Sequence, residues 1–218
     1  MRRSAERTLR SAPSKVSFEQ GGPPHRPYGV PPSVRPPARF AVPQPTMIPD
    51  IRPYRPGDDL AAITDLIHRA YAVHLQHGLR YWGTHQPASD TEKRLRAGVG
   101  LVMLWQGEYI GTVTVRPPQP ESSVALYRDP TVYSLSQFCV EPRFKGQGLG
   151  RRLHDHALAV ARERGARTIA LDTARPATAL IRLYEAWGYA VVGECDWRSH
   201  TNYVSVLMAR PVDIATTC

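Results

Sequence analysis

Three glycines stand at every second position in the stretch "EPRFKGQGLGRRLHDHALAVARERG", which runs from Glu141 to Gly165. They lead directly into a segment with helical periodicity, so their amides lie where a helix has unsatisfied N–H donors and partial positive charge. A loop without β-carbons at such a place lets an anion approach the backbone closely. The sequence therefore predicts a phosphate-binding loop, flanked by basic side chains at Arg143, Lys145, Arg151 and Arg152.

Two familiar phosphate-binding patterns do not fit this loop. A P-loop needs GxxxxGK[ST], and the sequence contains no such string. A dinucleotide fingerprint needs GxGxxG directly after a strand, with an acidic residue about 20 positions later. Asp172 stands 26 residues beyond Gly146, but the loop reads GxGxG, and five residues separate it from the β-rich run that ends at Val140.

A third pattern matches. The string "FCVEPRFKGQGLGRRL" resembles the acetyl-CoA-binding signature of the GNAT N-acetyltransferase superfamily, in which a strand, a proline and a glycine loop open a helix. The family's second motif, LYxxxG[FY], is matched by "LYEAWGY" at Leu183–Tyr189. The resemblance is close from Val132 to Pro211 and extends, through the order of elements, back to about Ile48.

The resemblance implies acetyl-CoA as cosubstrate, and the spacing of the cysteines and histidines predicts no metal site. The pyrophosphate of acetyl-CoA is expected on the loop, and its pantetheine arm between two parallel strands that splay apart, Tyr133–Val140 and Arg167–Asp172. Backbone groups of the first strand would bind the arm and polarise the thioester carbonyl. The implied cofactor-binding residues are Phe138, Cys139, Val140, Lys145, Gly146, Gln147, Gly148, Leu149, Gly150 and Arg151.

The implied reaction is direct attack of a primary amine on the thioester in a ternary complex. Tyr184 matches the motif position of the family's general acid, which protonates the departing thiolate; at helical spacing from Leu180 and Trp187 it could equally be a packing aromatic. No general base is assigned, since the strand before the loop contains no carboxylate. Weak candidates are Glu141, Asp172, Glu194 and His200.

Some residues depart from the family pattern or carry an alternative chemistry. Lys145 replaces the usual Arg or Gln, and Ala177 replaces a common Asn that helps to bind the cofactor. Cys139 would lie beside the thioester, but a buried structural cysteine is the favoured interpretation over an acetyl-enzyme. His154 and His156 lie two positions apart, so a helix would point them in different directions and they could not share a metal ion.

The acceptor is expected to be a small-molecule or peptide amine. Aromatic residues in "HLQHGLRYWGTHQP" and "DWRSHTNYVSV" could line its pocket or cap the core, namely Tyr81, Trp82, His85 and His200. A non-catalytic module that senses CoA or binds a partner is the alternative function. A homodimer is compatible with the sequence.

The elements that must position these residues follow from hydrophobic periodicity. Gly57, Asp58 and Asp59 predict the start of a helix over residues 60–70, and Ser89 and Asp90 that of a second helix. Beyond them the pattern reads ββαβαββ, with a hairpin at residues 106–108. We expect an α/β fold of GNAT type: a mixed, mostly antiparallel sheet with a splayed parallel pair, flanked by helices.

Composition sets the domain organisation. Ten of the 21 prolines lie between Pro13 and Pro45, so residues 1–46 are predicted to be a disordered Pro/Arg-rich extension, with Met47 as an alternative start. An N-acetyltransferase domain (48–211) and a short tail (212–218) follow. Residues 1–50 contribute +5 of the net charge of +9, which argues against nucleic acid as a partner of the domain. Apolar runs are too short for a membrane span, and three unpatterned cysteines favour the cytoplasm.

Overall fold

The structure is a computed structural model that describes residues 48–212. The predicted extension (1–46), the alternative start at Met47 and most of the predicted tail (212–218) lie outside the described residues. Val212 is described: it is buried, and its N–H donates to the Arg167 carbonyl over 2.9 Å. Within the described range, every helix falls short of the length and apolar character needed to cross a bilayer.

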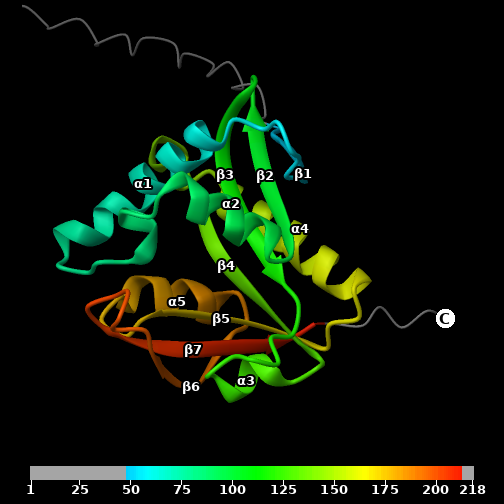
Figure 1. The fold of residues 1–218 in the computed structure, drawn as a ribbon, viewed down its shortest axis with the longest axis vertical. Helices are drawn as coiled ribbons and strands as arrows, with labels where there is room; N and C mark the ends of the chain where they lie inside the picture. The colour runs from blue at the N-terminus through cyan, green and yellow to red at the C-terminus, as the bar shows by residue number, and fades with distance from the viewer. Residues whose placement is uncertain (1–47, 213–218) are drawn as a thin grey trace, which may run out of the picture. The chain divides into compact units, whose positions relative to one another are not determined.

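A single seven-stranded sheet forms the centre of this region, in the order β1-β2-β3-β4-β5-β7-β6 (Figure 1). All neighbouring strands are antiparallel except β4 and β5, so the predicted mixed sheet with one parallel pair is confirmed. The strands are β1 (Asp50–Pro53), β2 (Val99–Trp105), β3 (Glu108–Arg116), β4 (Val132–Val140), β5 (Thr168–Ala174), β6 (Ala190–Asp196) and β7 (Val204–Pro211).

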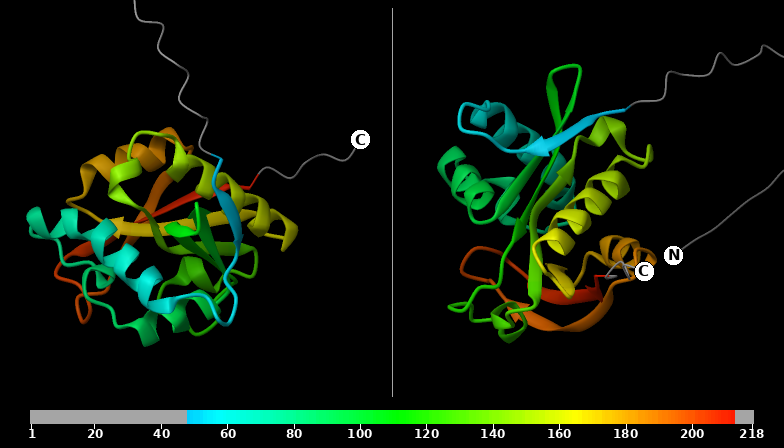
Figure 2. Two further views of the ribbon diagram at one scale, coloured as in Figure 1. Left: turned by 90° about the horizontal axis from the view of Figure 1, so that it is seen from above. Right: turned by 90° about the vertical axis from the view of Figure 1, so that its right-hand side faces the viewer.

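Helices cover both faces of the sheet (Figure 2). On one face lie α1 (Leu60–Gln76) and α2 (Ala88–Arg96), and on the other α4 (Leu149–Glu163) and α5 (Thr178–Ala186). Burial follows helical spacing: Ile63, Leu66 and Ile67 of α1 form one apolar cluster, and Leu149, Leu153 and Ala157 of α4 join a separate, larger one. These helices fall where periodicity predicts them.

Three short elements were not expected, namely α3 (Ala125–Arg128), η1 (Trp82–Thr84) and η2 (Pro142–Phe144). The predicted cap of α2 is wrong, because Pro87 occupies the N-cap position without a side-chain bond. Asp59 does cap α1, accepting from the Ala62 N–H over 2.9 Å. Asp58 instead binds Arg52, and hydrogen bonds from that guanidinium lower the pKa of the Asp58 carboxyl to about 2.

The parallel pair separates after only three rungs. Val132, Tyr133 and Ser134 of β4 face Thr168, Ile169 and Ala170 of β5, although both strands continue well beyond these residues. The β3–β4 register also shifts between Thr112 and Thr114, next to Gln137, a non-glycine residue with φ of 57°. A bulge of this kind re-aims a strand, so β4 leaves β5 and opens the sheet at its centre.

Candidate active site

The head of α4 presents backbone donors that no protein group accepts. Lys145 and Gln147 use their amides in turns, donating to the carbonyls of Pro142 (3.1 Å) and Phe144 (3.4 Å). Within residues 48–212, the other amides of this stretch have no protein acceptor: those of Gly146, Gly148, Leu149, Gly150 and Arg151. A cluster of free donors at the positive end of a helix suits a phosphate, so these residues fit a pyrophosphate group.

Two of the three loop glycines are required by conformation. Gly146 and Gly148 have φ of 82° and 76°, where a β-carbon is strained, and a β-carbon at either position would meet no atom within 4 Å. The space in front of the loop is therefore open. Gly150 differs, because it lies in α4 with ordinary backbone and its β-carbon would make a normal contact with Trp187, at 3.8 Å.

The basic side chains around the loop divide into two groups. Arg143 is paired with Glu108 and lies over the ring of Phe144. Arg151 binds Asp155 one turn along the helix, at 2.8 Å. Lys145 and Arg152 form no ion pair with any described residue, so they are the flanking cations free to meet an incoming anion.

On β4, the predicted cofactor-binding residues point to both faces. Phe138 and Val140 pack with the cluster beneath α4, whereas Cys139 packs among Ile63 and Leu66 of α1. Burial raises the pKa of the Cys139 thiol to about 12, which leaves it protonated and a poor nucleophile. The carbonyl of Phe138 accepts a hydrogen bond from the Tyr71 hydroxyl, at 3.2 Å, so this backbone oxygen already has a partner.

Tyr184 lies on α5, facing the sheet and buried between aromatic rings. Trp187 and Tyr189 contact it edge-on, each with ring centroids 5.8 Å away. No hydrogen bond to its hydroxyl is found among the described residues, and burial raises its pKa above the usual value. A protonated phenol with a free O–H is what a proton donor requires, and the ring also packs in the core, so the two interpretations of Tyr184 coexist.

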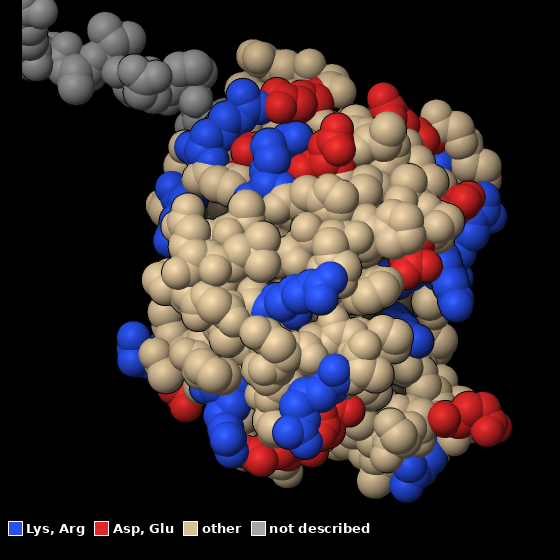
Figure 3. Space-filling view, turned by 60° about the vertical axis from the view of Figure 1, so that its left-hand side comes forward, with Lys and Arg blue, Asp and Glu red and all other residues tan. Residues whose placement is uncertain are grey.

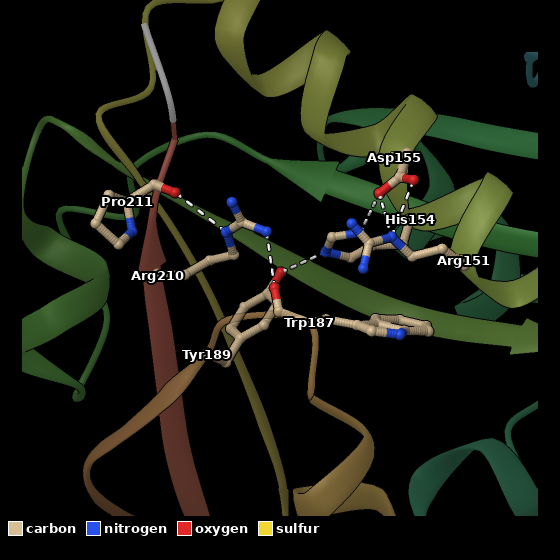
Figure 4. A network of polar contacts seen from close by, with 7 residues as sticks. All are labelled: Arg151, His154, Asp155, Trp187, Tyr189, Arg210 and Pro211. Atoms are coloured by element: carbon tan, nitrogen blue, oxygen red, sulfur yellow. Dashed lines mark hydrogen bonds and ion pairs between the residues drawn. The ribbon is translucent and has the colours of Figure 1, made fainter. Parts of the chain in front are cut away.

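A buried histidine links the two sequence motifs (Figure 4). His154 of α4 has no exposed surface; its Nδ1 lies 3.0 Å from Asp155 Oδ1 and its Nε2 3.0 Å from the Tyr189 hydroxyl. The imidazole also packs on Trp187, with ring centroids 4.8 Å apart. Sequence analysis missed this role, since its only signal was a polar residue on the apolar side of the predicted helix.

A second polar network supports the bulge in β4. Gln86, which is fully buried, donates from Nε2 to the Gln137 side-chain oxygen and to Thr91 Oγ1, both over 2.7 Å. Its own oxygen accepts from Arg94 of α2 at 2.8 Å. The side chain of Gln137, whose backbone is left-handed, is thus bound by Gln86 from the segment between α1 and α2, and Gln86 is bound in turn by two residues of α2. Sequence patterns gave no sign of this chain of contacts.

The predicted acceptor-pocket residues come together from distant parts of the chain. Trp82 contacts His85 and His200 edge-on, with ring centroids 4.8 and 5.1 Å away. Tyr81 is buried against Tyr203, and its hydroxyl lies 2.9 Å from Thr173 Oγ1 at the end of β5. Asn202 binds Arg80 and Gly78 and so joins the segment after α1 to the β6–β7 hairpin. Figure 3 shows mostly uncharged surface across the middle of this side of the molecule, with basic side-chain surface at its centre.

The four weak base candidates differ sharply in their surroundings. Glu141 is bound by Arg69 over 2.8 Å, Glu194 lies near Arg175 on the surface, and His200 is exposed. Asp172 is half-buried on β5 just beyond the last β4–β5 rung, and desolvation raises its carboxyl pKa. It accepts hydrogen bonds from Tyr127 (3.0 Å) and Trp197 (3.1 Å). Across residues 48–212, no cluster of His, Cys, Asp and Glu has the composition of a metal site.

Comparison with known proteins agrees with this geometry. The chain is 31% identical over 163 residues to the mycothiol acetyltransferase of Sanguibacter keddieii, covering 75% of this chain and 47% of that protein. The mycothiol acetyltransferase of Salinispora tropica is also 31% identical, over 78% of this chain and 53% of its own length. The chain thus spans about half the length of the curated relatives it matches.

Solved structures share the fold at lower identity. The ribosomal-protein-S18-alanine N-acetyltransferase of Escherichia coli superposes with a TM-score of 0.58 at 19% identity, over 78% of this chain and 97% of that one. Salmonella typhimurium yncA, solved with its cofactor acetyl-CoA, superposes with a TM-score of 0.55 at 23% identity, over 76% of this chain and 95% of that one. The model of the Acetyltransferase (GNAT) family matches residues 60–189. From its sequence motifs, its parted strands and this match, the chain belongs to the GNAT acetyltransferase family.

Proposed function

We propose that the protein transfers the acetyl group of acetyl-CoA to a primary amine by direct attack in a ternary complex. The observation that carries this proposal is the set of free amides at the head of α4, next to strands that separate after three rungs. The relatives named acetyltransferases and the neighbour solved with acetyl-CoA support the same cosubstrate. Acetyl-CoA would supply the activated acetyl thioester.

The chain's own residues have distinct roles in this proposal. Amides from Gly146 to Arg151 bind the pyrophosphate, with Lys145 and Arg152 adding positive charge. Beyond Ser134, β4 has no pairing partner on its β5 side, and backbone donors there bind and orient the thioester. Tyr184 holds the proton that the departing thiolate needs, because burial keeps its phenol protonated. Asp172 is the best placed of the four candidates to receive the proton of the amine.

The test combines binding with turnover. A ligand present at about 100 times its Kd should raise stability by roughly 2.7 kcal/mol. Acetyl-CoA should therefore raise the melting temperature, and NAD at the same concentration should not. Release of CoA in the presence of an amine panel should then show turnover. If acetyl-CoA does not change the melting temperature, the whole proposal is contradicted. Binding without turnover on any amine would instead support the alternative of a CoA-sensing module. A cytoplasmic location and a homodimer stay predictions.

A further inference from the structure

Buried polar atoms without partners gather on one face of the sheet, where β4 and β5 separate. Folded proteins leave few such atoms unsatisfied, and each one that remains points to a water molecule, an ion or a ligand group. This face is the one covered by α1 and α2, opposite the α4 head. The atoms are Thr114 Oγ1, Arg116 Nε, Ser136 Oγ and Gln137 Nε2; a fifth such atom among the described residues, Ser205 Oγ, lies on β7.

Strand register shows that these atoms surround the opening. Arg116 stands opposite Ser134, and Ser134 stands opposite Ala170 in the last β4–β5 rung. Two residues further along, on the same face, β3 and β4 pair Thr114 with Ser136, while β5 carries Asp172. The unpaired atoms therefore line the side of the opening that faces away from the pyrophosphate loop, where an acceptor would meet the thioester.

The charges on this face are not balanced by the protein. Arg116 is half-buried, and its Nε has no hydrogen-bond partner within residues 48–212; over the same residues, the Arg94 side chain donates only to Gln86. Burial, and then the nearby Arg94, lower the pKa of the Arg116 guanidinium. Among the described residues, no carboxylate lies within 4.0 Å of either arginine.

Acidic groups near this face compensate only in part. Asp172 attracts Arg116 from farther away, and its oxygens are already bound by Tyr127 and Trp197. Glu141 is neutralised by Arg69. Two guanidinium groups and one carboxylate thus leave one positive charge over, beside hydroxyls that lack partners. Burying such a charge is costly unless an anion meets it.

We propose that Arg116 and Arg94 bind a carboxylate of the acceptor, so that the substrate is an amine that also carries a single negative charge. A carboxylate matches the planar donor fork of arginine and accepts hydrogen bonds from the Thr114 and Ser136 hydroxyls as well. Its one charge equals the excess on this face. The proposal rests on the proposed acetyl transfer, and it narrows the acceptor to amino acids, peptides with a free carboxylate, or related amino acids with a longer spacer.

Matched amine pairs test the substrate class. Each pair consists of an amine that carries a carboxylate and a matched amine that lacks it, and the three pairs differ in the distance between amine and carboxylate. The pairs are L-alanine with L-alaninamide, glycylglycine with glycylglycinamide, and γ-aminobutyrate with butylamine. For at least one pair, kcat/KM for the carboxylate member should exceed that of its partner by about 10-fold or more. Phosphoethanolamine with ethanolamine separates a preference for phosphate from one for carboxylate. Equal use of both members at every spacing overturns the proposal.

Variants of Arg116 separate ligand binding from a structural role. Arg116→Gln removes an unpaired buried charge, so it should raise the melting temperature of the unliganded protein, by about 2–4 °C. The same variant should reduce the preference for the carboxylate member to about 1, and Arg116→Lys should keep part of it. Arg162→Gln, an exposed change on α4, should alter neither property. If Arg116→Gln destabilises the fold and slows both members of a pair equally, the residue is structural and the proposal fails.

A binding measurement keeps this test independent of turnover. With CoA in place, γ-aminobutyrate or glycylglycine should raise the melting temperature of the parent protein more than the uncharged partner does, and should not do so for Arg116→Gln. This result would support the carboxylate site even if no amine were acetylated. If the protein acetylates amines but neither the turnover of the amine pairs nor the melting-temperature shift depends on Arg116, the proposed carboxylate site is wrong and the proposed acetyl transfer still stands.

Discussion

His154 of α4 and Tyr189, which follows α5, lie 3.0 Å apart from imidazole Nε2 to phenol oxygen, in the core of the molecule. The contact joins the helix that follows the glycine loop to the end of the LYxxxGY motif. Because Trp187 packs on the same imidazole and also lies beside Gly150, the head of α4 is packed directly against the turn that follows α5. The position of the loop amides therefore depends on residues more than 30 positions away in sequence.

The first prediction concerns pH. Burial lowers the pKa of His154 below its usual value near 6.5, so the unfolded chain takes up a proton before the folded protein does. The contribution of the neutral His154 to the free energy of unfolding is complete above about pH 6.5, and it is lost as the pH falls toward the pKa of His154 in the folded protein. His154→Gln should show a smaller loss of urea midpoint between pH 7 and pH 5 than the parent. The exposed His156→Gln is the control, and equal slopes in the parent and His154→Gln would contradict the prediction.

The second prediction compares two glycines with similar positive φ angles. Gly148 and Gly165 have φ of 76° and 86°, and a β-carbon at either would meet no atom within 4 Å. Alanine at each position should therefore lower the free energy of unfolding by a similar amount, about 1–2 kcal/mol. Only Gly148→Ala places a methyl group in front of the free amides, so only this variant should weaken acetyl-CoA binding by calorimetry, by about 10-fold or more. An equal loss of affinity in Gly165→Ala would show that the effect is general strain.

The third prediction assigns the proton donor. Tyr184→Phe keeps the ring contacts with Trp187 and Tyr189 and removes only the hydroxyl. Loss of a general acid should lower kcat by about 100-fold, while the Kd for acetyl-CoA stays the same. Tyr133→Phe is the matched control, since its hydroxyl binds the Arg164 carbonyl away from the opening. An unchanged kcat in Tyr184→Phe would make the residue a packing aromatic.

The fourth prediction concerns Cys139. Its thiol is buried against α1 with a pKa raised to about 12, so Cys139→Ala should keep kcat and cost about 1 kcal/mol of stability through lost packing. Intact-mass spectrometry during turnover should find no acetyl group on the protein. If the parent protein became acetylated during turnover and the Cys139→Ala variant did not, the reaction would pass through a covalent acetyl-enzyme, and direct attack would be wrong.

The sequence predicted most of the fold because periodicity and motif agree over long segments. The apolar positions of α1 and α4, the strand that ends at Val140 and the left-handed glycines of the loop all follow from local rules of spacing and backbone freedom. The parallel pair followed from the family resemblance. Its short length could be measured only in the structure, from the three rungs that end at Ser134 and Ala170.

Features that depend on distant partners could not be predicted. Gln137 has a left-handed backbone, and its side chain accepts a hydrogen bond from Gln86, 51 positions earlier. Arg116 looks like an ordinary charged residue at the end of a strand, and only the arrangement of Arg94 and Ser136 around it shows that its charge is unmet. For His154, the sequence spacing shows only that it cannot share a metal ion with His156, since a core histidine becomes recognisable when both of its hydrogen-bonding partners are known.

The short pairing between β4 and β5 also affects how firmly the two halves of the sheet are held together. With so few ladder bonds, the strands from β1 to β4 and the strands from β5 to β6 behave as two half-sheets joined by a narrow seam. A chain-like molecule lying in the gap would complete the missing ladder as a surrogate strand, hydrogen-bonded to the backbones on either side. Amide hydrogens of residues 136–140 should then exchange more slowly as that molecule saturates the protein. A cosubstrate bound in this way would stabilise the contact between the two half-sheets as well as take part in the reaction.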